Sequence, residues 1–249
     1  MAATQDRAQT RGFDVDSPQW KIAAARRILF RNGLDSDVGG HVSMRAGEED
    51  AFWANPVQYG DETLPEHVVK MGFDLKIRES GSFIDRSNAG FFHRDFYQAR
   101  PDANCVIHTH GKWMTLLTTL GVPFDAYFIY GGLFLDEVGV FEDAADKPLA
   151  EEGDRMTAAL GGGKILLWAH HGSVHVGPTL EETVVEAIQF EICCERQVVA
   201  MGVGGKPMKR GVAENYKQAI PKGPWHQDYW DAQVRRLRQS DPDLFEPRA

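Results

Sequence analysis

The most informative segment of this chain lies near its middle and reads Arg100-Pro101-Asp102-Ala103-Asn104-Cys105-Val106-Ile107-His108-Thr109-His110. Its apolar run predicts a buried strand that leads into two histidines. Side chains alternate between the two faces of a strand, so residues at i and i+2 project from the same face. His108 and His110 are therefore predicted to stand side by side at the end of this strand, as half of a metal site.

A second pair of histidines follows another apolar run. Residues 164–168 (KILLW) predict a buried strand, and Ala169-His170-His171-Gly172 comes directly after it. The glycine allows the backbone to turn tightly. Three neutral imidazoles suit a divalent transition metal and leave coordination positions open for water or substrate. Two histidine pairs, each after a buried strand, favour a metal site over histidines that merely share a polar pocket.

The composition is that of an ordinary globular protein, with 43% hydrophobic and 25% charged residues among 249. The net charge of −9 argues against a nucleic-acid partner, since no basic stripe offsets it. No apolar run approaches the ~20 residues of a membrane span, so no membrane partner is expected. The first residues show no apolar core of a signal peptide, and the three cysteines are expected to be reduced thiols. Together these features favour a cytoplasmic protein.

The order of the expected elements indicates the fold class. Residues 1–17 are expected to form a loose N-terminal segment, and residues 18–249 a single domain. Helices are expected at 18–32, 91–99, 112–120, 149–160, 180–201 and 229–238, and strands near 41–45, 51–54, 74–78, 105–108, 164–168 and 173–176. Residues 202–223 are rich in glycine and lysine and are expected to form an excursion. This order favours an α/β fold with a mixed or mostly antiparallel sheet between helical layers.

These motifs, taken in order, resemble the class II aldolase/adducin family. The family's signature is a helix bearing a histidine, then Arg-Pro-Asp, an apolar strand with His-x-His, and later a strand ending in Asn-His-Gly or His-His-Gly. The chain carries its counterparts across roughly residues 20–205, as His93, Arg100-Pro101-Asp102, His108-Thr109-His110 and His170-His171-Gly172. Gly40-His41-Val42-Ser43-Met44-Arg45 is similar to a further segment of the family.

The resemblance implies a three-layer α/β/α fold that binds a small-molecule substrate. It also implies one divalent metal, zinc, manganese or iron, in each subunit of a homo-oligomer, often a tetramer with sites between subunits. It assigns the metal ligands as His108, His110 and His171, and it leaves His170 a supporting or packing role.

One position departs from the aldolase pattern. Aldolases of the family carry a glutamate four residues before the helical histidine, where it serves as the general base and touches the metal. Ala89 stands at that position here, and the nearest upstream carboxylates, Asp85 and Glu79, do not align with it. Ser87 and Asn88 are the remnant of serines that bind the sugar phosphate, and they are predicted to bind substrate. The departure argues against a standard sugar-phosphate aldolase.

Four further residues are candidates for the substrate pocket. Tyr127 and Tyr130 lie in an aromatic and glycine-rich segment, which either packs in the core or places one tyrosine in the pocket as a proton donor. His41 stands where some relatives use asparagine to touch substrate, and a catalytic role is predicted for it. His175 shares a face with His171 if the segment is extended, so it is predicted either to bind substrate or to pack.

Three functions remain open on the sequence alone. The first is a metal-dependent carbon–carbon lyase that decarboxylates a keto or hydroxy-aromatic acid, because decarboxylation needs an electron sink but no base to start it. The second is a non-haem Fe(II) oxygenase of an aromatic keto acid, although the commoner iron site has two histidines and a carboxylate. The third is a non-catalytic module like the adducin branch, which generally lacks the metal histidines.

Overall fold

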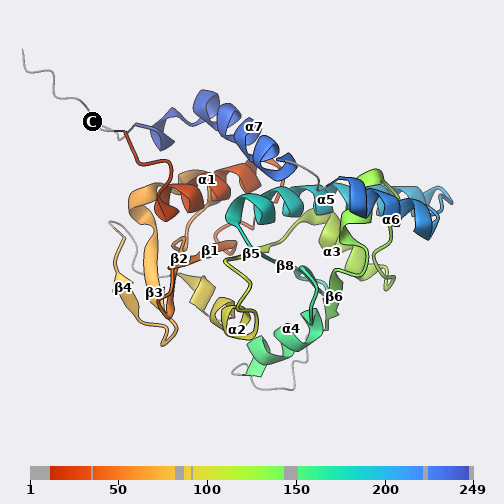
Figure 1. Ribbon diagram of the computed structural model, residues 1–249, viewed down its shortest axis with the longest axis horizontal. Coiled ribbons are helices and arrows are strands. Elements are labelled where there is room, and N and C mark those ends of the chain that lie inside the picture. The colour runs from red at the N-terminus through yellow and green to blue at the C-terminus, as the bar shows by residue number, and fades with distance from the viewer. Residues whose placement is uncertain are drawn as a thin grey trace, which may run out of the picture.

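A computed structural model of the chain describes residues 12–34, 36–81, 87–90, 92–142, 151–220 and 224–246. Its framework is an eight-stranded sheet in the order β4-β3-β2-β1-β5-β8-β7-β6. Figure 1 shows this sheet with helices above and below it. The strands are β1 (His41–Arg45), β2 (Ala51–Ala54), β3 (Val69–Gly72), β4 (Ile77–Glu79), β5 (Cys105–Thr109), β6 (Val138–Phe141), β7 (Ile165–Trp168) and β8 (Gly172–Gly177).

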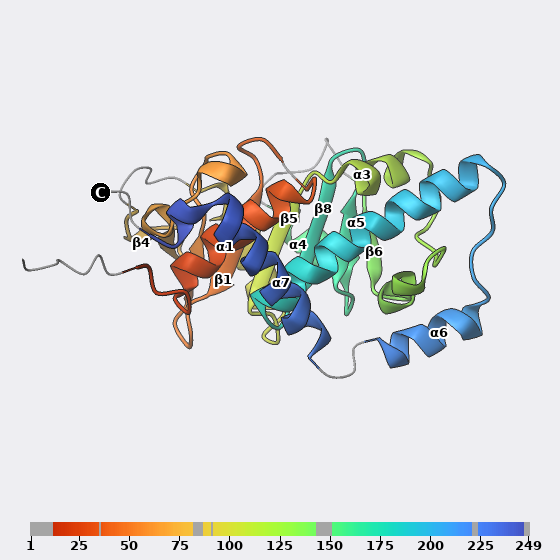
Figure 2. The same ribbon diagram turned by 90° about the horizontal axis from the view of Figure 1, so that it is seen from above.

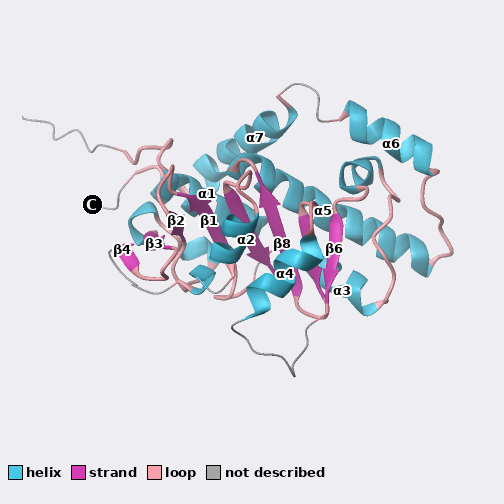
Figure 3. Cartoon of the chain, turned by 60° about the horizontal axis from the view of Figure 1, so that its bottom comes forward, coloured by secondary structure: helices cyan, strands magenta, loops and turns pink. Residues whose placement is uncertain are grey.

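The helices form the outer layers. They are α1 (Pro18–Arg31), α2 (His93–Ala99), α3 (Lys112–Thr119), α4 (Glu152–Leu160), α5 (Leu180–Gly202), α6 (Arg210–Ala219) and α7 (Trp225–Ser240), with short 3-10 turns that include η3 (Asn88–Gly90), η4 (Ile129–Phe134) and η6 (Pro242–Leu244). In Figure 2, α1, α5 and α7 lie over the strands, and in Figure 3, α2 and α4 lie in front of the opposite face. The predicted α/β/α layering is confirmed.

The pairing of the strands confirms the prediction of a mostly antiparallel sheet. β6 and β7 run parallel, and the other neighbouring pairs are antiparallel. Successive residues of β5 enter different cores, because Ile107 packs in the cluster under α1 and α5 whereas Val106 packs in the cluster under α2. This alternation explains the uninterrupted apolar run of a strand that is buried on both faces.

Several segments differ from the sequence expectation, and two strands, β3 and β6, were not expected at all. Residues 74–78 were expected to form one strand, but Leu75 adopts a left-handed φ of 62° in a turn, and β4 begins only at Ile77. The expected excursion at 202–223 contains α6, which packs on η4 and buries Ala213. Most of the expected loose segment 1–17 lies outside the described residues, and Ser17 caps α1 by accepting the Trp20 N–H at 3.2 Å.

The α5 helix is tied to β7 and α7 through a buried carboxylate. Glu186 accepts hydrogen bonds from Lys164 Nζ at 3.0 Å and from His226 Nε2 at 3.2 Å. Burial raises the pKa of Glu186, but the His226 hydrogen bond and the Lys164 charge outweigh it and leave the pKa below its ordinary value. The ionised form of Glu186 therefore stabilises the fold.

This contact predicts a pH dependence of stability. The folded pKa of Glu186 lies below the unfolded value, so its contribution is present above the unfolded pKa and is lost as pH falls through the folded pKa. Glu186→Gln should lower the free energy of unfolding by about 1–3 kcal/mol near neutral pH and progressively less below about pH 4.5. Urea unfolding from pH 3.5 to 7 measures this, with Glu214→Gln on exposed α6 as the control. An undiminished difference at pH 3.5 would contradict the assignment.

Among the described residues, no helix combines the length and apolar character needed to cross a bilayer.

Candidate metal centre

Three histidine side chains converge at one end of β5 and β8. The Nε2 atoms of His108 and His110 lie 3.0 Å apart, and those of His110 and His171 lie 3.1 Å apart. These three residues form a group whose ligand atoms all lie within 4.8 Å of one another. The structure thus brings together the three predicted ligands, with His108 on β5 and His110 one residue beyond the end of that strand.

His108 is the buried member of this group, with 3% of its surface exposed. Its Nδ1 donates to the carbonyl oxygen of Ser173 at 2.9 Å, which leaves Nε2 with a free lone pair directed at the other two rings. Burial, together with the neighbouring His41 and His110, lowers the pKa of His108 well below its ordinary value. His108 is therefore a neutral imidazole, the form that binds a metal ion.

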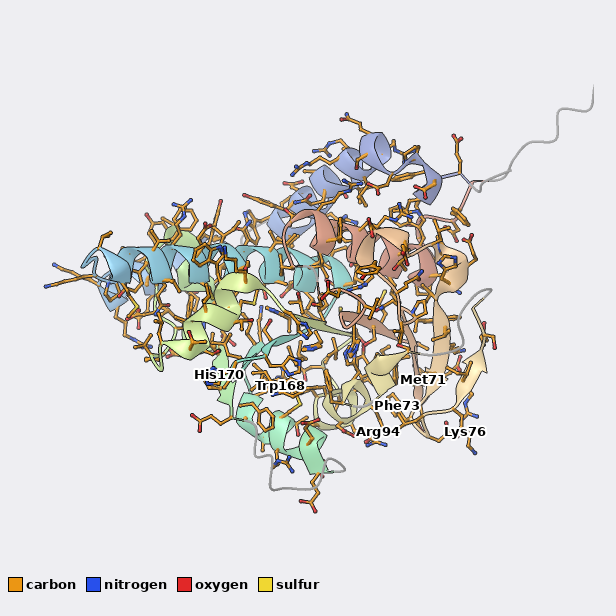
Figure 4. All side chains as sticks on the ribbon, turned by 180° about the vertical axis from the view of Figure 1, so that it is seen from behind. Met71, Phe73, Lys76, Arg94, Trp168 and His170 are labelled. Carbon is orange, nitrogen blue, oxygen red and sulfur yellow. The ribbon has the colours of Figure 1, made fainter. Side chains whose placement is uncertain are left out.

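The backbone around His171 holds its ring in place. Trp168 and Gly172 pair across the β7–β8 hairpin, so the three residues between them form its turn. His170 adopts a left-handed φ of 59°, and an added Cβ at Gly172 would collide with the Thr109 carbonyl. The Trp168 ring lies over the His171 ring with their centroids 3.9 Å apart. Figure 4 labels Trp168 and His170 at this end of the hairpin.

The donor set fits a divalent metal. Metal–nitrogen bonds of about 2.0–2.1 Å in tetrahedral geometry separate ligand nitrogens by about 3.3 Å, close to the separations of 3.0 and 3.1 Å found here. Unprotonated ring nitrogens directed at one another repel unless a cation or a proton lies between them. A cation held by all three would remove this repulsion, and His171 at the exposed side would leave coordination positions open to substrate.

Among the described residues, no aspartate or glutamate joins this group. Ala89 is fully buried in the core under α2, so the position of the family's glutamate holds only a methyl group. Glu79 lies on β4, where it is paired with Lys70 at 3.4 Å, and Asp85 lies outside the described residues. The candidate centre therefore consists of three histidines and no carboxylate among the described residues.

Two further buried histidines lie beside the centre. His41 pairs with His108 across β1 and β5, and their ring centroids are 5.3 Å apart. The ring centroid of His93 lies 5.5 Å from that of His41, and His93 Nδ1 is hydrogen-bonded to Ser43 Oγ at 2.6 Å. Neither His41 Nδ1 nor His93 Nε2 has a hydrogen-bond partner among the described residues. The sequence identified His93 only as a motif position, because its contact with Ser43 spans 50 residues.

The structure does not bring the remaining candidates to the centre. His175 pairs with Ile107, and therefore points to the α5 face, where its ring lies 6.1 Å from Phe190. His171 and His175 would share a face only if both lay in one extended strand. His171 belongs to the turn before β8, so the two side chains do not share a face. This placement opposes the predicted substrate role of His175. Ser87 Oγ accepts the Ala89 N–H at 3.3 Å, and the Asn88 side chain lies outside the described residues.

Tyr127 and Tyr130 lie near the helices of the α5 face. The Tyr130 hydroxyl is 3.2 Å from the Tyr229 hydroxyl of α7, and Tyr127 lines a surface groove beside Arg196 and Val199 of α5. None of the contacts described for either tyrosine involves a histidine of the centre. A tyrosine from the same chain is therefore not placed as a proton donor.

Comparison with known proteins identifies the family of the chain. Residues 20–198 match the family described as Class II Aldolase and Adducin N-terminal domain. A meiotically up-regulated gene 14 protein of Schizosaccharomyces pombe is 30% identical over 182 residues, or 72% of this chain and 70% of that protein. A 4-hydroxy-3-prenylphenylpyruvate oxygenase/4-hydroxy-3-prenylbenzoate synthase of Streptomyces roseochromogenus is 28% identical over 200 residues, or 78% and 72% of the two chains. Decarboxylase NovR of Streptomyces niveus is 28% identical over 193 residues, or 76% and 71%.

The fold also matches solved structures. An aldolase II superfamily protein from Pseudomonas syringae superposes with a TM-score of 0.81 at 22% identity, covering 91% of this chain and 94% of that one. The sequence match extends over the strands and turns that carry all three convergent histidines. The chain therefore belongs to the class II aldolase and adducin family.

Proposed function

We propose that this protein is a metal-dependent carbon–carbon lyase that decarboxylates a keto acid or a hydroxy-aromatic acid. The observation that carries the proposal is the convergence of three histidines without a carboxylate at the position of Ala89. Zinc, manganese or iron bound by His108, His110 and His171 would act as a Lewis acid that draws electron density from the substrate.

The residues present suit decarboxylation better than aldol cleavage. Aldol cleavage begins with removal of a hydroxyl proton, and a methyl group at position 89 cannot accept it. Loss of CO₂ leaves the bonding electron pair on the substrate carbon, so the protein must supply a proton only afterwards. His41 lies beside His108 with an unpartnered Nδ1, and we assign it to contact the substrate. If Tyr127 or Tyr130 is the proton donor, it must come from a neighbouring subunit of the expected tetramer.

The proposal predicts metal-dependent release of CO₂. The chain is loaded anaerobically with zinc, manganese or iron and assayed against a series of keto acids and hydroxybenzoic acids, with metal content measured on the same samples. We expect CO₂ release without oxygen in the wild type and in His170→Asn, and none in His171→Ala. His170 is the exposed neighbour of His171 and has a left-handed backbone, which asparagine tolerates, so His170→Asn is a matched control. Full metal content without turnover of either acid class would overturn the proposal.

An Fe(II) oxygenase is the second candidate, because a relative named as an oxygenase of a prenylated phenylpyruvate aligns over 78% of this chain. Three neutral ligands would leave open positions for both O₂ and a keto acid. Oxygen consumption that requires iron and disappears with zinc would support this candidate. Equal turnover in the absence of oxygen would exclude it.

A further inference from the structure

The α3 helix supports two of the three metal ligands at once. Its N-terminus follows His110 after the single residue Gly111. It also contacts the hairpin turn, because Thr118 Oγ1 accepts the His170 N–H at 2.9 Å while its own proton goes to the Thr115 carbonyl at 2.7 Å. A displacement of α3 would therefore move the His110 and His171 rings relative to His108, which is fixed within the sheet.

The N-terminus of α3 is capped by a side chain from another helix. Gly111, the N-cap residue, has no side chain that could accept the free N–H groups of the first turn. Glu191 of α5 accepts them instead, through Oε1 from the Trp113 N–H at 2.8 Å and through Oε2 from the Met114 N–H at 3.0 Å. The carboxylate thus takes the place of a local cap and sits at the positive end of the helix dipole.

The packing around this carboxylate leaves little freedom. Glu191 is 6% exposed, and a Cβ added to Gly111 would approach Glu191 Oε2 to 2.7 Å. A side chain at residue 111 would therefore displace the carboxylate from the position in which it caps α3. Because α5 packs on both α3 and β5, Glu191 fixes the start of α3 relative to the strand that carries His108.

We propose that Glu191 is a positioning residue for the metal centre, acting with Thr118 through α3 to set the separation of the three imidazoles. The inference rests on the metal centre of the proposed function but not on its reaction. Residues that orient ligands from outside the coordination sphere typically change metal affinity by about 10–100-fold when they are replaced. In Glu191→Gln the amide nitrogen faces one backbone N–H that needs an acceptor, so that hydrogen bond is lost.

The test measures metal binding to the full-length chain. Zn²⁺ affinity is determined by competition with a chromophoric chelator, and the visible spectrum of the Co²⁺-loaded protein reports the coordination geometry. Glu191→Gln and Thr118→Val are each expected to weaken Zn²⁺ binding about 10–100-fold and to change the Co²⁺ spectrum. Glu195→Gln, one turn along α5, and Thr119→Val, whose hydroxyl bonds only the Leu116 carbonyl among the described residues, are matched controls expected to keep wild-type values.

The outcomes separate positioning from general loss of structure. Thermal unfolding of the metal-free proteins identifies a variant that fails to fold, and Thr118→Val, with almost the same side-chain volume, keeps the test valid if Glu191→Gln unfolds. Wild-type affinity and spectrum in Thr118→Val and in folded Glu191→Gln would overturn the inference, as would failure of the wild type to bind Zn²⁺. Weakened binding in these variants together with a wild type that releases no CO₂ would support the inference while refuting the proposed decarboxylase.

Discussion

Replacing His108 with alanine is expected to abolish stoichiometric metal binding. His108 Nε2 is the ligand atom that the sheet holds most firmly, because the Ser173 carbonyl fixes the ring through Nδ1 and the residue is 3% exposed. The variant would retain two imidazoles, one of them on the exposed turn. Replacing a residue outside the coordination sphere typically lowers metal affinity by about 10–100-fold. We expect a larger loss of affinity in His108→Ala, because a ligand itself is removed, and we expect turnover to fall with it.

Metal analysis of the purified protein and chelator competition measure this loss. His170→Asn is a suitable control, because this histidine is exposed and lies outside the three-histidine group. It should keep one metal ion per chain. An unchanged metal content in His108→Ala would show that the three histidines are not the ligands, and it would favour a non-catalytic module like the adducin branch.

The largest effect on stability is expected at the contact between α1 and the end of α7. Asp241 accepts hydrogen bonds from Arg27 Nη1 at 3.0 Å and from Arg31 Nε at 2.7 Å, and the side chains of Arg27 and Asp241 are each 4% exposed. Removing one member of a buried ion pair leaves a charge without its partner, which typically costs about 3–5 kcal/mol. Asp241→Ala should cost about 3 kcal/mol, the lower end, because Arg27 retains its bonds to Asp243.

Urea unfolding at neutral pH measures this cost. Glu49→Ala is the control. Glu49 pairs with Lys70, but its side chain is 63% exposed, so the urea midpoint of this variant should stay near that of the wild type. Equal midpoints for Asp241→Ala and Glu49→Ala would show that the buried pair does not anchor the C-terminal helix to α1.

The closeness of His108, on β5, and His110, one residue beyond its end, could be predicted from sequence because the geometry is local. Alternation along a strand places residues i and i+2 on one face wherever that strand lies in the sheet. The ligand His171 was assigned by family resemblance, and the structure brings its Nε2 to 3.1 Å from that of His110. The layered fold was likewise indicated by the order of apolar runs, and the solved relative confirms it.

Two alternatives that the sequence left open depend on contacts between distant segments. His175 was assigned a face by its spacing from His171, but strand register pairs it with Ile107, and a left-handed residue at 170 puts His171 in a turn. Tyr130 was predicted either to pack in the core or to line the pocket, and its hydroxyl lies 3.2 Å from the Tyr229 hydroxyl of α7. Neither the register of paired strands nor the packing of a helix from a later part of the chain can be predicted from local periodicity.

The sequence by itself determined which residue types are available to bind a metal and that a methyl group replaces the family's glutamate, because ligand chemistry and the identity of residue 89 do not depend on the fold. The tertiary structure alone decided how the rings are held. It placed the Glu191 carboxylate, 80 residues beyond Gly111, at the start of α3, and it turned the His108 lone pair toward its two partners. These contacts join segments that no local pattern connects, so only the packing of α5 and α3 against the sheet brings them together.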